Sequence, residues 1–265
     1  MESPHFRKPG ACFRAWRMST LGRVLIEKAA YENGWERTLN ATDSSAQVAS
    51  ARHPVKAEIT LTGSEQYGVQ VDSESVTAEL ARDWQTDSGH GFPAASRIEL
   101  ARLLQRAAQL ALALPPGAED QYRKQIEELP AGSLGDTEIL RLTRQRFGQE
   151  VYRKALMDYW GGACAATGIA LPVVLRASHA RPWAECESDA QRLDVFNGFL
   201  LVANLDALFD QGLVSFLDDG RMICSGQIGQ GSLQALGLGA DTGLRWIADA
   251  HRPYLGWHRA NKFSA

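Results

Sequence analysis

Two short apolar segments, separated by a polar stretch and followed by a short helical pattern, leave few folds open to the C-terminal half of the chain. Apolar residues run through 173–177 and 198–202, and residues 185–194 between them are mostly polar. Apolar runs of about four to eight residues bounded by polar segments are typical of buried strands. Residues 204–210 have a helical pattern. We therefore expect strand, loop, strand and helix in that order.

Polar residues suited to metal binding and proton transfer lie at the ends of these elements. His179 ends the first strand, Asn197 opens the second, and Asp206 and Asp210 lie on the helix. A two-stranded ribbon packed on a helix brings such ends within one side-chain length. The two aspartates are four residues apart, which puts both carboxylates on one helix face, as a divalent cation held by oxygen ligands requires.

Five short segments in this order resemble the HNH, or ββα-metal, endonucleases found in many bacterial restriction-type proteins. They are FGQEVYR at 147–153, CAATG at 164–168, ASHARPW at 177–183, NGFLLV at 197–202 and LDALFDQGL at 205–213. The resemblance covers residues 137–216. It implies a phosphodiester hydrolase, a metal-dependent DNA endonuclease with a restriction or defence role.

The resemblance assigns a role to each of four residues. His179 matches the general base that activates a water to attack the phosphorus, a role suited to an imidazole whose pKa lies near neutrality. Asn197 matches the central asparagine, which fixes the loop between the strands and helps orient the histidine. Asp206 takes the place of the last metal ligand, and Asp210 lies one turn later. Carboxylates favour Mg²⁺ or Mn²⁺ over zinc because hard oxygen ligands suit hard cations.

One position of the metal site departs from the family pattern. The residue before the base is usually Asp or His and helps to bind the metal, whereas this chain has Ser178. A hydroxyl is a poor metal ligand. Either Asp210 or a bound water compensates for it, or His179 itself binds the metal and another residue acts as the base.

A structural zinc site found in many relatives is not expected in this chain. Those relatives hold the zinc with the four cysteines of two CxxC pairs, and only one of these four positions is a cysteine in this chain, Cys164. The other three places are taken by Thr167, Val202 and Leu205.

Basic residues near these motifs are candidates for DNA contact. Arg181 follows the base and could bind a phosphate. The preceding helix carries further cations that could track a DNA backbone, although such charges also form solvated helix faces. They are Arg141, Arg144, Arg146, Arg153 and Lys154, of which Arg146, Arg153 and Lys154 are our candidates.

The rest of the chain suggests a separate N-terminal domain, so that the fold class is α+β with a C-terminal ββα-metal nuclease. Residues 55–71 alternate like a β-hairpin, and residues 96–114 form a helix with Ser96 and Glu99 as a capping box. Pro and Gly residues then interrupt the pattern until a second helix begins near Asp136 and ends at Gly161 and Gly162. A hairpin at 214–225 and a helical tail at 252–263 follow. We predict domains at 1–115 and 136–265 joined by a linker at 116–135.

Composition limits the setting in which the chain works. None of its 265 residues lie in an apolar run of the roughly 18 residues that a membrane-spanning helix requires. The first sixteen residues are basic and aromatic where a signal peptide would be apolar. Four cysteines occur singly, which indicates neither a disulfide framework nor a four-thiolate zinc site. We expect a cytoplasmic protein with no membrane partner, and the net charge of −3 does not exclude a local basic face for DNA.

Two other functions and an oligomeric state follow from the same features. Ser178 in place of a metal ligand suggests, as an alternative, a degenerate module that binds DNA without cutting it. The second alternative is a nuclease that becomes active when a ligand or protein binds to the N-terminal half. Because one ββα-metal site breaks one strand, we expect a homodimer, with the N-terminal half selecting the target DNA or mediating dimerisation.

Overall fold

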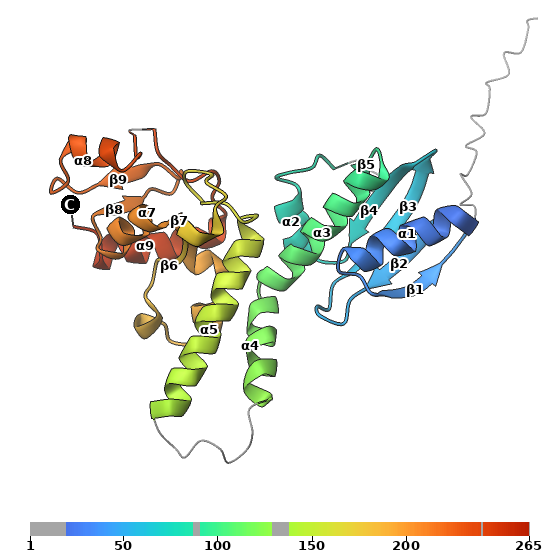
Figure 1. Cartoon of the computed structure of the whole chain (residues 1–265), viewed down its shortest axis with the longest axis horizontal. Coiled ribbons are helices and arrows are strands. Elements are labelled where there is room, and N and C mark those ends of the chain that lie inside the picture. Colours follow the sequence, from blue (N-terminus) through green and yellow to red (C-terminus); the bar gives the residue numbers. More distant parts are fainter. Residues whose placement is uncertain (1–19, 87–90, 129–137, 240, 265) are drawn as a thin grey trace, which may run out of the picture. The chain divides into compact units, whose positions relative to one another are not determined.

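The computed structural model describes residues 20–86, 91–128, 138–239 and 241–264 (Figure 1). The chain divides into two compact units, Met1–Ala108 and Gln109–Ala265, and the division falls inside the long helix α3 (Arg97–Ala113). The expectations for residues 1–16 and for a helix cap at Asp136 lie outside the described residues. The domain limits at 115 and 136 remain a prediction.

An antiparallel sheet of five strands, paired in sequence order, forms the centre of the first unit. The strands are β1 (Arg37–Ala41), β2 (Ser45–Ala49), β3 (Lys56–Gly63), β4 (Gln66–Val71) and β5 (Phe92–Ala94). β3 and β4 form the hairpin predicted at 55–71, which turns at Glu65 with a φ of 65°. Alternate side chains such as Ile59 and Val69 are buried, so one face of the sheet belongs to the core.

Three helices accompany this sheet: α1 (Thr20–Glu32), α2 (Glu74–Leu80) and α3. α3 begins with the predicted capping pair, because the Glu99 N–H donates to Ser96 Oγ at 3.2 Å and the Glu99 carboxylate accepts from the Ala95 N–H at 2.7 Å. Its buried face has the helical spacing expected from the sequence. The residues of that face are Leu100, Leu103, Leu104 and Ala107.

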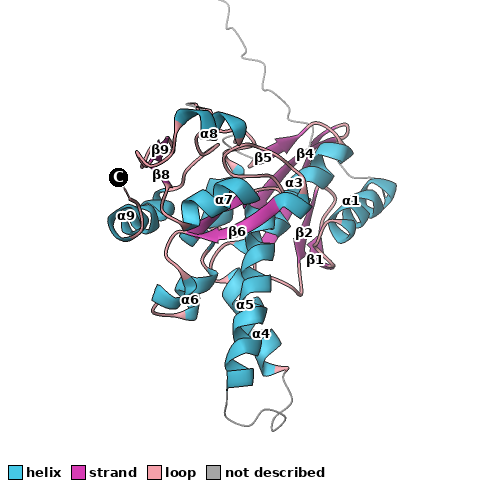
Figure 2. Ribbon diagram, turned by 60° about the vertical axis from the view of Figure 1, so that its left-hand side comes forward, coloured by secondary structure: helices cyan, strands magenta, loops and turns pink. Residues whose placement is uncertain are grey.

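The second unit begins with two helices that pack against each other, α4 (Gly117–Glu127) and α5 (Glu138–Tyr159) (Figure 2). α4 lies within the segment predicted as a linker. α5 ends just before Gly161 and Gly162, whose φ values of 63° and 71° are in the left-handed region that favours glycine. The predicted end of this helix is therefore confirmed.

The predicted order of strand, loop, strand and helix is confirmed after α5. β6 (Leu175–His179) pairs antiparallel with β7 (Gly198–Val202), and α7 (Ala203–Asp210) follows β7 directly. The connection between the strands contains the short helix α6 (Asp189–Leu193). The first strand starts two residues later than predicted, because Pro172 begins a turn of 3₁₀-helix at Pro172–Val174. Proline lacks a backbone N–H for the strand and favours a helical turn at its first position.

The remainder of this unit contains the predicted hairpin and tail helix. β8 (Val214–Phe216) pairs with β9 (Met222–Cys224), and α8 (Gln230–Ala235) and α9 (Arg252–Asn261) follow. Phe199, Phe209 and Phe216 are fully buried, and their ring centroids lie 5.6–5.9 Å apart. This aromatic cluster fixes β7, α7 and β8 against one another. Among the described residues, no helix combines the length and the hydropathy needed to cross a bilayer.

Candidate active site

The β6–β7 ribbon and α7 carry the residues singled out in the sequence. His179 is the last residue of β6 and pairs with Gly198, the first residue of β7. A Cβ atom on Gly198 would lie 2.0 Å from the Ser178 carbonyl oxygen and 2.3 Å from Tyr152 Oη, so only glycine permits this close pairing. The His179 side chain therefore lies at the end of the ribbon, directly after Ser178.

The His179 ring lies between aromatic side chains and a backbone carbonyl. It stacks on Tyr152, with ring centroids 3.8 Å apart and an interplanar angle of 14°, and Trp183 meets it edge-on at 6.0 Å. Its Nε2 lies 2.9 Å from the Arg192 carbonyl oxygen. Because a carbonyl can only accept a hydrogen bond, Nε2 carries the proton and Nδ1 is the unprotonated acceptor. Among the described residues, no hydrogen bond to that Nδ1 is formed.

Burial lowers the pKa of His179 to about 4, and the hydrogen bond to the Arg192 carbonyl opposes this shift only in part. The imidazole is therefore neutral at physiological pH. This pKa lies below the near-neutral value expected from the sequence, because the rings and the loop that bury the imidazole come from distant parts of the chain.

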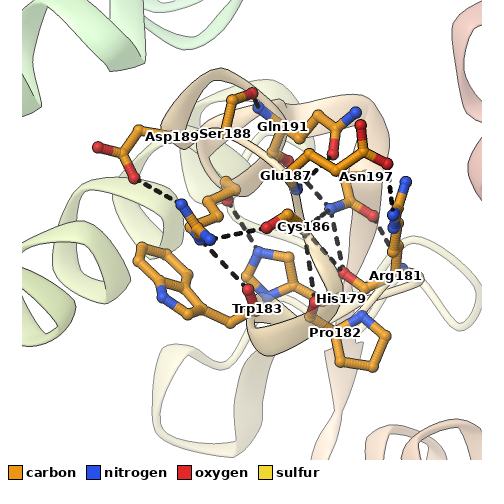
Figure 3. Close-up of polar contacts among 11 residues, drawn as sticks. His179, Arg181, Pro182, Trp183, Cys186, Glu187, Ser188, Asp189, Gln191 and Asn197 are labelled. Carbon is orange, nitrogen blue, oxygen red and sulfur yellow. Dashed lines mark hydrogen bonds and ion pairs between the residues drawn. The ribbon is translucent and has the colours of Figure 1, made fainter.

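Asn197 holds together the loop between the two strands (Figure 3). Its side chain is fully buried and bonds both backbone groups of Arg181, accepting from the N–H at 2.8 Å and donating to the carbonyl at 3.1 Å. The amide also donates to the Gln191 carbonyl at 3.0 Å and to Cys186 Sγ at 3.3 Å. This geometry matches the loop-fixing role that the resemblance implies. The Asn197 side chain thus connects the start of the loop at Arg181 with Gln191 near its end.

Arg192 fixes the carbonyl that holds the histidine. Its guanidinium donates to the carbonyls of Trp183 and Cys186 at 3.2 and 2.7 Å and to the Asp189 carboxylate at 2.9 Å. The guanidinium carbon also lies 5.7 Å from the centre of the Trp183 ring. Sequence reasoning did not identify this residue, because Arg192 contacts His179 through its backbone carbonyl.

A second group of polar side chains lies around Ser178, directly before His179 in the chain. Ser178 is buried, and its Oγ has no hydrogen-bond partner of standard geometry among the described residues. Burial raises the pKa of Asp206, the nearby Ser178 hydroxyl lowers it, and the charge of Asp210 raises it. Asp206 is half-buried and Asp210 is exposed. Asp206 thus lies near both Ser178 and Asp210, and the charge of Arg176 lowers its pKa.

This donor set suits a hard cation. In the described part of the chain, no group of three or more His, Cys, Asp or Glu side chains could hold a metal ion. Two carboxylates and a hydroxyl with an unsatisfied oxygen nevertheless match Mg²⁺ or Mn²⁺, which bind few protein oxygens and keep several waters. Zinc sites usually include nitrogen or sulfur ligands, and Ser178, Asp206 and Asp210 supply only oxygen.

Comparison with known proteins agrees with this geometry. Residues 164–217 match the model of a family described as HNH endonuclease. This part of the chain is therefore similar to the HNH endonucleases. The match begins at Cys164 and ends just after β8, so it contains the ribbon, its loop and α7. No match to a curated protein was found. At the level of the family, the HNH region indicates nuclease activity.

α5 lies outside the matched residues, yet it supports the HNH site at three points. A Cβ atom on Gly148 would lie 2.2 Å from the Trp183 ring, so glycine lets this ring pack against the helix. Tyr152, one turn later, stacks on His179. Arg153 donates to the carbonyls of Leu175 and Pro172 at 2.8 and 3.1 Å, where β6 begins. The FGQEVYR segment therefore holds the strand, the base and its aromatic neighbour.

The basic residues predicted to contact DNA all have partners within the chain. Arg181 pairs with Glu187 at 2.9 Å, Arg146 pairs with Glu150 at 3.4 Å, and Lys154 pairs with Asp158. Arg153 is engaged by backbone carbonyls. DNA contact by these four residues stays a prediction.

Sequence reasoning missed a cation that lies nearer to the oxygen donors. Arg176 is exposed on β6, and its guanidinium donates to the Val173 and Leu175 carbonyls at 3.0 Å. It is two residues before Ser178 in the strand, so both side chains belong to the same face. That two-residue spacing was the signal that could have identified it.

Proposed function

We propose that this chain is a metal-dependent DNA endonuclease in which His179 is the general base and Ser178, Asp206 and Asp210 hold one Mg²⁺ or Mn²⁺ ion. The observation that carries the proposal is the bond from His179 Nε2 to the Arg192 carbonyl. It leaves the Nδ1 lone pair free to accept a proton. The aromatic walls around the ring hold that lone pair in one direction.

The chain's own residues provide the proton transfer. His179 Nδ1 accepts a proton from the attacking water as the water oxygen bonds to phosphorus. The bond from phosphorus to the 3′ oxygen breaks, and the leaving oxygen keeps the bonding electrons and takes a proton from solvent. The products are a 5′-phosphate and a 3′-hydroxyl end, and His179 then returns its proton to solvent.

The remaining residues of the site orient these groups. Asn197 and Arg192 fix the loop whose carbonyl holds the His179 ring. Ser178, Asp206 and Asp210 would bind the divalent ion through oxygen atoms. When bound, such an ion supplies Lewis-acid stabilisation of the charge on the phosphate and on the leaving oxygen. Arg176 beside Asp206 is placed to contact a phosphate of the substrate.

A restriction or defence role is the biological setting that we propose for this activity. Each site would break one strand, so a double-strand break requires two sites acting close together. Two copies of the chain, with the N-terminal unit selecting the target, would supply them.

The proposal is tested by plasmid cleavage with Mg²⁺ or Mn²⁺ and the variant His179→Ala. We expect a loss of at least about 10²-fold in the cleavage rate, with unchanged DNA affinity and with the chain still folded at the assay temperature. Added imidazole should restore part of the rate. Asp249→Asn, at a side chain that is 89% exposed, serves as the surface control and should cut normally. Near-normal cleavage by His179→Ala would show that another residue is the base.

One observation favours a second candidate function. Ser178 supplies a hydroxyl where relatives supply a carboxylate or an imidazole, so the oxygen donors could be too few for a catalytic ion. A chain that binds DNA tightly but leaves it uncut in both Mg²⁺ and Mn²⁺ would be a DNA-binding module derived from an HNH nuclease.

A further inference from the structure

Tyr152 on α5 contacts both the candidate base and the loop that holds it. Its ring is 1% exposed and lies nearly parallel to the His179 imidazole at 3.8 Å. Its hydroxyl donates to the Asn197 carbonyl oxygen at 3.1 Å. That same carbonyl accepts from the Ala180 N–H at 2.9 Å, directly after His179 in the chain. One tyrosine thus contacts the base side chain and the backbone that follows it.

We propose that Tyr152 is a positioning residue for His179, whose ring fixes the plane of the imidazole and whose hydroxyl fixes the adjoining Asn197 carbonyl. The inference rests on the proposed role of His179 as the general base. It assigns to α5, outside the region matched to the HNH family, a function in the reaction.

The contacts around His179 explain why the stacking matters. The hydrogen bond from Nε2 to the Arg192 carbonyl holds one end of the ring but leaves rotation about that bond open. A ring stacked at 3.8 Å blocks this rotation, because the imidazole would have to pass through van der Waals contact. Together, the hydrogen bond to Arg192 and the stacking on Tyr152 fix the direction in which the Nδ1 lone pair points.

Trp183 closes a second side of the same ring. It meets His179 edge-on, and it reaches this place because Gly148 leaves room for it on α5. Gly148 and Tyr152 are four residues apart, so they lie on one face of the helix. A single helix face therefore sets both aromatic walls of the base.

A purely structural role would give a different result from a positioning role. Tyr152→Phe keeps the stacked ring and removes only the hydroxyl, whereas Tyr152→Leu keeps apolar volume but removes the flat surface. Tyr159→Leu is the matched control, since Tyr159 lies on the same helix, is 0% exposed and packs against Trp160 and Phe196. If Tyr152 only fills space, both leucine variants should lose stability and neither should lose cleavage rate at a temperature where they are folded.

The experiment measures single-turnover plasmid cleavage by the full-length chain at saturating enzyme, together with DNA affinity and thermal unfolding. For Tyr152→Leu we expect the cleavage rate constant to fall about 10- to 100-fold, as misplacement of a catalytic group by about 1 Å can cause, with DNA affinity unchanged. Tyr152→Phe should stay within about threefold of wild type because the stacking wall is kept. Tyr159→Leu should cut at the wild-type rate.

A spectroscopic readout tests the positioning without relying on activity. Nitrogen-15 NMR of the His179 ring should show the Nε2-protonated tautomer in the wild type and in Tyr159→Leu, and a mixture of tautomers in Tyr152→Leu. Wild-type rate and tautomer in Tyr152→Leu, or an equal loss of rate in Tyr159→Leu, would overturn the inference. Cleavage by His179→Ala would instead refute the proposed base, and the tautomer of His179 in Tyr152→Leu would still decide whether Tyr152 positions the ring.

Discussion

Replacing Gly148 with alanine sets two known effects against each other. In the middle of a helix such as α5, alanine is favoured over glycine by about 1 kcal/mol. At this position, however, the new Cβ would lie 2.2 Å from Cη2 of Trp183, well inside van der Waals contact. The ring must shift by more than an ångström, to about the 3.5–4.0 Å at which carbon atoms meet. Overpacking of this kind typically costs about 1–3 kcal/mol.

Gly256 offers a control with the same helical gain and none of the steric cost. It lies inside α9, and the nearest atom to a Cβ there is Arg259 Nη2 at 4.0 Å, an ordinary contact. Gly256→Ala should therefore raise the free energy of unfolding by about 1 kcal/mol. Because both substitutions share the helical gain, the difference between them isolates the clash, and we expect Gly148→Ala to be less stable than Gly256→Ala by about 1–3 kcal/mol.

Urea unfolding followed by circular dichroism and tryptophan fluorescence measures this difference, and plasmid cleavage measures its effect on the site. Since Trp183 lines the His179 ring, its displacement should also lower the cleavage rate of Gly148→Ala, while Gly256→Ala cuts normally. The reasoning is refuted if Gly148→Ala is stabilised as much as Gly256→Ala, because Trp183 would then impose no constraint on the helix.

Two further predictions concern the metal donors and the acid stability of the second unit. Asp206→Asn should raise the Mg²⁺ concentration needed for half-maximal cleavage at least about tenfold, because a charged oxygen ligand is lost. The control Asn204→Ala, which loses only a bond to the Leu236 carbonyl, should leave that concentration unchanged. Equal shifts in the two variants would show that Asp206 does not bind the metal. Burial lowers the pKa of His258 to about 4, with Ser215 and the Phe209 carbonyl as its hydrogen-bond partners. His258 therefore takes up a proton near pH 6.5 in the unfolded chain but only near pH 4 in the folded chain. The free energy of unfolding should fall as the pH drops from about 6.5 to 4, by up to about 3 kcal/mol from this residue. His258→Gln should flatten that fall, and urea denaturation at pH 7, 5.5 and 4.5 would measure it; an unchanged slope would show that His258 does not carry the effect.

The part of the site that the sequence could predict is the part made by neighbours in the chain. The period of apolar residues placed β7 and α7, and the capping pair Ser96 and Glu99 placed the start of α3. Pro172 shifted the start of β6 because its ring favours a turn over an extended strand. These outcomes follow from local backbone preferences, which a single sequence expresses directly.

The surroundings of His179 could not be predicted in this way. Tyr152 precedes it by more than twenty residues, and Arg192 acts through a carbonyl that every residue type possesses. The pKa of the histidine depends on how closely these groups bury it, which is a property of tertiary packing. The FGQEVYR segment was noticed as a motif, but the reason for its glycine, tyrosine and arginine became visible only through their contacts with Trp183, His179 and the start of β6.

The long connection between β6 and β7 has a consequence for the order of folding events. Residues 180–197 must close into a loop before His179 can pair with Gly198, and closing a flexible loop of this size costs about 3 kcal/mol of chain entropy. α5 and α7 need no such closure, since their hydrogen bonds join residues four apart. The hydrogen bonds of Asn197 span the loop from Arg181 to Gln191 and form only after it closes. We therefore expect the ribbon to assemble after its flanking helices, so that weakening Asn197 speeds unfolding far more than it slows refolding.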